Sequence, residues 1–162
     1  MRKLVLIAMV VAVAGCAVAP APQPRTAVYN PSEYAPYGRK GNGRILGQAF
    51  LKTVGGDVKY GAGCDVVLHP VTSLTTEWFE KHIVQRIPLQ AGDPRGDQYA
   101  VRTIANGEGR FGFEHLPAGQ YYLTCVIKWG VPSDIGVLPA GGVAYAKVTV
   151  PENGTVAAIV TR

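Results

Sequence analysis

The stretch GRFGFEHLPAGQYYLTCVI, residues 109–127, has the clearest strand pattern in the chain. It contains two segments of strand length, 110–114 and 121–127, separated by the turn sequence Leu-Pro-Ala-Gly at 116–119. Proline and glycine favour turns because one has a fixed φ and the other tolerates positive φ. Along 121–127 every second residue, from Tyr121 to Ile127, is apolar, so these side chains share one face of a strand. The stretch therefore predicts two neighbouring strands that turn an apolar face to a core.

The rest of the chain contains more segments of this kind. Period-2 alternation or β-branched and aromatic residues mark 44–51, 64–70, 99–104, 143–150 and 155–160 as strands. The pairs Asn106-Gly107 and Asn153-Gly154 are turn signals, since both residue types accept positive φ. Together the segments predict an all-β, seven-stranded sandwich over residues 44–162.

One segment has a helical pattern instead. Ser73 is a candidate N-cap for a helix to about residue 86, with Trp78, Phe79, His82 and Ile83 on one side, and Pro88 stops it. We expect residues 73–98 to form an insertion that packs over the sandwich or its edge.

Four motifs in order resemble a known family: GRILGQA at 43–49, GCDVVLHP at 63–70, GRFGF at 109–113 and LPAGQYYL at 116–123. They are similar to the carboxypeptidase regulatory-like domain, a prealbumin-like (transthyretin-like) β-sandwich related to Cna B-type repeats. The likeness covers about three quarters of the chain, residues 43–162, and the insertion departs from it. It implies a prealbumin-like fold and a non-catalytic accessory, adhesive or structural module.

The first sixteen residues have the features of a lipoprotein signal. Arg2 and Lys3 precede an apolar run at 4–14, which is too short to span a bilayer as a helix. Val-Ala-Gly-Cys at 13–16 resembles a bacterial lipobox, which implies cleavage after residue 15 and lipidation of Cys16, through acyl chains such as palmitate. An ordinary secretory signal with an incidental cysteine is the alternative. Ala17 differs from the aspartate that retains enteric lipoproteins in the inner membrane, so the resemblance favours the outer membrane, facing the periplasm.

Residues 16–43 are predicted to be the lipidated cysteine and a flexible tether rich in proline and glycine. Tyr29, Tyr34 and Tyr37 interrupt the tether, and they are compatible either with a partly ordered tail or with docking onto the domain or a partner.

Charge gives little information about partners. The chain of 162 residues carries 16 basic and 11 acidic side chains, but residues 44–162 hold 11 basic and 10 acidic ones. This near-neutral domain predicts no nucleic-acid partner. The length fits one domain with a tail.

If Cys16 carries lipid, Cys64 and Cys125 remain as an even pair in an oxidising compartment. Both lie on predicted inward faces, so we expect a disulfide across the two sheets, with two buried free thiols as the alternative.

Catalytic and metal-binding patterns are absent from the sequence. The histidines, His69, His82 and His115, form no zinc-binding motif, and no serine lies in a Gly-x-Ser-x-Gly elbow. We therefore expect neither a metal nor a cofactor, and no enzymatic activity.

Three functions remain as hypotheses. The first is a membrane-anchored lipoprotein that presents its sandwich to an envelope protein for structure or assembly. The second is a periplasmic module that binds glycan or another small ligand through the insertion and Trp129. The third is an enzyme whose residues converge only in space. Trp78, Phe79 and Trp129 are the candidate binding surface: a polar cleft beside the rings would favour a ligand, and a flat apolar patch a protein.

Overall fold

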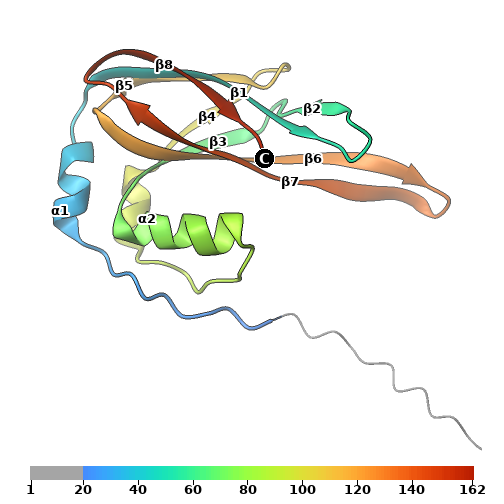
Figure 1. The fold of residues 1–162 in the computed structure, drawn as a ribbon, viewed down its shortest axis with the longest axis horizontal. Helices are drawn as coiled ribbons and strands as arrows, with labels where there is room; N and C mark the ends of the chain where they lie inside the picture. Colours follow the sequence, from blue (N-terminus) through green and yellow to red (C-terminus); the bar gives the residue numbers. More distant parts are fainter. Residues whose placement is uncertain (1–19) are drawn as a thin grey trace, which may run out of the picture.

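The computed structural model describes residues 20–162, so the predicted signal peptide at 1–15 and Cys16 lie outside the described residues. It is built of strands with short helices (Figure 1). The strands are β1 (Asn42–Lys52), β2 (Val58–Tyr60), β3 (Asp65–Pro70), β4 (Val101–Ile104), β5 (Arg110–Leu116), β6 (Gly119–Ser133), β7 (Gly136–Val150) and β8 (Asn153–Val160). The helices are α1 (Pro31–Tyr34), η1 (Ala35–Tyr37), α2 (Ser73–Glu77), η2 (Trp78–Val84) and η3 (Pro94–Tyr99).

The strands form two four-stranded sheets, which confirms a β-sandwich as the architecture. In one sheet, β1 pairs antiparallel with β2 and β5 and parallel with β8. The other sheet has the order β4-β3-β6-β7, with antiparallel pairing throughout.

The core lies between the sheets and contains the residues that alternation placed on inward faces. Val66 and Leu68 from β3 and Leu123 from β6 are completely buried there. Phe111 and Phe113 of β5 close the core from the opposite sheet. The stretch at 109–127 therefore supplies one strand to each sheet.

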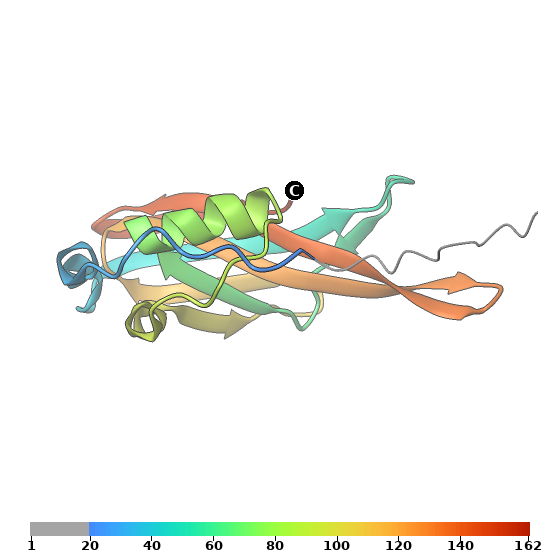
Figure 2. The same cartoon turned by 90° about the horizontal axis from the view of Figure 1, so that it is seen from below.

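The prediction of seven strands is wrong in number, because the described residues form eight. The additional strand β2 has three residues, too few to show a period, and it pairs with the end of β1. Strands β6 and β7 are also longer than predicted and form one continuous hairpin that projects beyond the other strands (Figures 1 and 2). Its distal part contains Gly130, Pro132, Pro139 and Gly141, whose residue types indicate a loop rather than strands.

The predicted helix exists and packs over the sandwich as a third layer (Figure 2). Its N-cap is Thr72 rather than Ser73, and Thr75 completes a capping box. After residue 77 the helix continues with π-helical hydrogen bonding to Val84. Phe79 stacks on Tyr122 of β6, with ring centroids 4.0 Å apart, so the helix covers the outer face of the β4-β3-β6-β7 sheet.

The flexible tether is a wrong prediction for residues 20–43, which pack on the domain. Tyr34 is completely buried, stacks on Tyr29, packs at a tilt against Tyr99, and accepts a hydrogen bond from the Thr72 hydroxyl. Gln23 forms a parallel bridge with Leu89 of the insertion. We call residues 20–37 the N-terminal segment. This segment is ordered because its aromatic side chains bury apolar surface on the domain. Its proline-rich composition alone would suggest a disordered chain.

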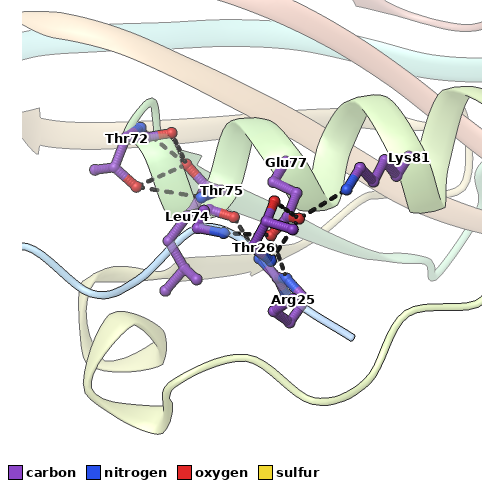
Figure 3. Close-up of polar contacts among 8 residues, drawn as sticks. Arg25, Thr26, Thr72, Leu74, Thr75, Glu77 and Lys81 are labelled. Atoms are coloured by element: carbon purple, nitrogen blue, oxygen red, sulfur yellow. Dashed lines mark hydrogen bonds and ion pairs between the residues drawn. The ribbon is translucent and has the colours of Figure 1, made fainter. Parts of the chain in front are cut away.

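Glu77 fixes this segment to the helix (Figure 3). The Arg25 Nε donates to Glu77 Oε2 over 2.8 Å, and the Thr26 hydroxyl and Lys81 Nζ donate to Oε1 over 2.6 and 2.9 Å. Burial alone would raise the pKa of Glu77, but the hydrogen bonds from Arg25, Thr26 and Lys81 outweigh it and lower that pKa far below the usual range.

The disulfide between Cys64 and Cys125 is confirmed, with the two Cα atoms 6.2 Å apart. Its predicted course across the two sheets is wrong. Cys64 directly precedes β3, and Cys125 lies in β6 opposite Val66, so the bridge joins neighbouring strands of one sheet. The alternation in the sequence could not distinguish a bridge between the sheets from a bridge within one sheet, because both cysteines point into the core.

Candidate functional site

A groove runs between the helix and the outer face of the β4-β3-β6-β7 sheet. It consists of two adjoining cavities of about 680 Å³ each, a size common for ligand sites. Both cavities are lined by Val67, Trp78, His82, Arg102 and Thr124. We call this combined space the helix groove. Its floor is the sheet, and one wall is the helix.

Trp78 lines both cavities of the helix groove, and His69 lines one of them beside it. Their ring centroids are 4.8 Å apart, with the planes tilted by 56°. Burial, together with the charge of Arg102, lowers the pKa of His69 to about 4. His69 is therefore neutral near pH 7, with one ring nitrogen able to donate and the other to accept.

Arg102 and Asp65 form an ion pair at the sheet side of the groove. Both side chains are more than a third exposed, so the pair is open to solvent and to a ligand. A guanidinium has five N–H donors, which leaves Arg102 donors for a second acceptor. Thr124 and Lys128 of β6 add a hydroxyl and a cation to the lining.

The insertion after the helix forms the second wall. Residues 89–94, Gly96 and Asp97 line one of the two cavities, together with Arg25 of the N-terminal segment. Asp93 caps η3 and holds Arg95 by an ion pair of 2.6 Å, which lowers the pKa of Asp93 to about 2. Gly96 is buried: a Cβ there would lie only 2.8 Å from the Tyr34 hydroxyl. This wall is thus packed against the N-terminal segment.

The structure separates the three aromatic residues that the sequence grouped as a binding surface. Trp78 lines both cavities, but Phe79 is buried between the helix and the sheet, where it contacts Tyr122 and Tyr145. Trp129 lies outside both cavities, partly buried against the core. Adjacent helix positions differ in direction by about 100°, and here Phe79 points at the sheet while Trp78 points into the groove.

Three lining residues, His69, Arg102 and Thr124, were not predicted from the sequence as binding residues. Alternation was a usable signal, because each lies on the outward face of a predicted strand. The sequence did not show that the insertion covers this outer face of the sheet.

Within residues 20–162, no group of three or more His, Cys, Asp or Glu side chains could hold a metal ion. No helix in the same range is long and apolar enough to cross a membrane.

Comparison with known proteins finds the fold among solved structures. No family model and no curated protein matches the chain. A crystal structure from Pseudomonas aeruginosa, described as that of a "putative carbohydrate binding protein", is similar to it with a TM-score of 0.74 and 28% sequence identity. The similarity covers 83% of this chain and 97% of the other.

Proposed function

We propose that the helix groove binds an oligosaccharide of the bacterial cell envelope. The observation that carries this proposal is the position of Trp78, an aromatic ring beside neutral and charged hydrogen-bonding groups in a solvent-accessible groove. The Pseudomonas protein with the similar fold supports the same class of ligand.

The chemistry of the groove suits a sugar ring. One face of a pyranose presents C–H groups, and these pack well on the electron-rich face of an indole. Hydroxyl groups at the ring edge need partners that donate and accept. Neutral His69 offers both, Thr124 offers a hydroxyl, and Arg102 offers charged donors.

The remaining parts of the proposal rest on the sequence. Lipidation of Cys16 would anchor the protein in the outer membrane, facing the periplasm, where envelope glycans are within reach. The resemblance to carboxypeptidase regulatory-like domains favours a module that binds without catalysing a reaction. Presentation of the sandwich to an envelope protein, the first hypothesis from the sequence, stays a prediction.

Titration calorimetry with a panel of envelope oligosaccharides, neutral and acidic, tests the ligand class. We expect Trp78→Ala to weaken binding at least about tenfold, because a nucleic-acid base stacked on an aromatic side chain contributes roughly 1–3 kcal/mol and a sugar ring on the indole should contribute a similar amount. Trp129→Ala is the matched control, since Trp129 lies outside the groove, and it should bind like the unchanged protein. Equal losses in both variants, or no binding by the unchanged protein, would overturn the proposal.

Membrane fractionation of Cys16→Ala tests the anchor separately. The variant should leave the membrane fraction and keep its oligosaccharide affinity. A variant that stays in the membrane would refute lipid anchoring at Cys16, without bearing on the groove.

A further inference from the structure

The far end of the β6–β7 hairpin is apolar and has no partner among the described residues. We call residues 130–141 the hairpin end. Asp134 is its single charged residue. Its apolar side chains reach far into solvent: Ile135 is 88% exposed and Val137 72%. Large apolar side chains exposed together mark a contact surface.

This apolar surface surrounds the hairpin end. Val131 pairs with Leu138, so both lie on the face that continues from the core, and both are exposed. Pro132 pairs with Val137, which places these two on the opposite face. A flat protein surface would cover one face only. An apolar medium that surrounds the end accounts for both.

The backbone of the hairpin end suits such a medium. Strand β3 pairs with β6 only up to Cys125, so beyond that residue β6 has β7 as its one neighbour. Backbone N–H groups on free edges are costly in a bilayer. Pro132 and Pro139 lack this N–H, which removes two donors from the edges. Asp134 at the turn still limits insertion to a shallow depth.

The base of the hairpin end has the residues of a membrane interface. Trp129 directly precedes it on the core side of β6, and the exposed cation Lys128 lies on the opposite face of the same strand. The Arg162 guanidinium lies against Gly142, on the second strand. Tryptophan favours the headgroup level of a bilayer, and cations favour anionic headgroups. An apolar tip followed by a tryptophan and cations is the arrangement expected of a peripheral membrane contact.

We propose that the hairpin end inserts shallowly into a phospholipid bilayer and orients the domain on it. The covalent chain is compatible with this position. Three residues separate Cys16 from Pro20, so a lipid on Cys16 would hold Pro20 within about 14 Å of its attachment point. The N-terminal segment leads along the helix to α1, and it starts on the side of α1 toward which the hairpin extends (Figures 1 and 2). The contact does not depend on the ligand of the groove.

A probe at the turn reports insertion independently of any anchor. The full chain with Ile135→Cys carries a polarity-sensitive fluorophore and is bound to vesicles of phosphatidylglycerol and phosphatidylethanolamine in equal parts. We expect a blue shift of its emission and quenching by brominated lipid. Ser32→Cys in α1, at the end of the molecule away from the hairpin turn, is the matched control and should show neither change (Figure 1). The chain without an added cysteine corrects for labelling of Cys16.

A second pair of variants tests the apolar side chains. Val137→Ser with Leu138→Ser should lower the quenched fraction of the label at position 135 about tenfold, as expected for the loss of two buried aliphatic groups. Ile104→Ser with Ile159→Ser removes two similarly exposed aliphatic residues from other strands and should leave the quenched fraction unchanged. A label at position 135 that stays in water on vesicle-bound protein would overturn the proposal. The proposal would also be overturned if the label were shielded from water in native membranes but not in vesicles, because a protein would then cover the hairpin end.

Discussion

The Arg25 guanidinium lies 2.8 Å from the Glu77 carboxylate and joins residues 52 positions apart in the sequence. Both side chains are nearly buried, with 12% and 7% of their surface exposed. Arg25 also donates to the Leu74 carbonyl, so it contacts the helix at two points. This contact fixes the N-terminal segment to the helix, and with it one wall of the groove.

Glu77→Gln should destabilise the protein by about 3–5 kcal/mol, because Arg25 would remain buried without a counter-charge. Chemical denaturation at pH 7 measures the loss. Glu80→Gln is the matched control: Glu80 is exposed on the same helix and should change stability by less than about 0.5 kcal/mol. The difference should vanish in acid. Since the pKa of Glu77 is lowered by folding, its contribution is full above the unfolded-state pKa of about 4.3 and is lost as the pH falls further.

Tyr34→Ala should release the N-terminal segment from the domain. The side chain is completely buried between Tyr29 and Tyr99, so truncation should cost about 3–5 kcal/mol. Tyr34→Phe keeps the ring and loses only the hydrogen bond with Thr72, for about 1 kcal/mol. Limited proteolysis near residue 25 should be fast in the alanine variant and slow in the phenylalanine variant. Equal proteolysis rates would mean that the ring does not hold the segment.

Reduction of the disulfide should lower the stability of the whole sandwich, rather than unfold the groove alone. Cys64 and Cys125 are 61 positions apart, and closing a loop of that length stabilises by about 4 kcal/mol in the chain-entropy model. Cys64→Ser with Cys125→Ser should lose about that much in thermal or chemical denaturation. The unchanged protein in reducing agent should lose a similar amount, and an unaffected transition would contradict the expectation.

His69 should make the protein less stable in mild acid. Burial lowers its pKa from 6.5 to about 4, so the unfolded chain binds an additional proton between these values. Stability is therefore full above about pH 6.5 and falls by up to about 3 kcal/mol towards pH 4. His69→Gln should flatten this part of the pH profile. His115→Asn, at an exposed position with φ of 58° that asparagine tolerates, should leave the profile unchanged.

The sequence predicted the strands that contact the core and the helix, because these features repeat with a local period. Alternation at Val66 and Leu68, and at Tyr121 to Ile127, placed the inward faces correctly. Alternation failed at the distal hairpin. Proline and glycine there predict a loop, but pairing between β6 and β7 keeps these residues in strands.

The site was less predictable, because its contacts are non-local. Arg25 and Glu77 carry no common motif, and tyrosines in a proline-rich stretch look like those of a linker until their partners are known. Trp78 was predicted as a candidate, but the residues around it come from β3, β4 and β6, which only the fold brings together.

Trp78 and Phe79 should separate binding from stability, although they are adjacent in the sequence. Phe79 is 6% exposed and stacks on Tyr122, so Phe79→Ala should cost about 3–5 kcal/mol in unfolding free energy. Trp78 lies half-buried in the groove, so Trp78→Ala should cost less stability and more oligosaccharide affinity. Measuring both quantities for both variants, at a temperature where each is folded, checks the assignment. If Phe79→Ala lost affinity while folded and Trp78→Ala did not, the ligand would have to bind on the other side of the helix, and the helix groove would not be the site.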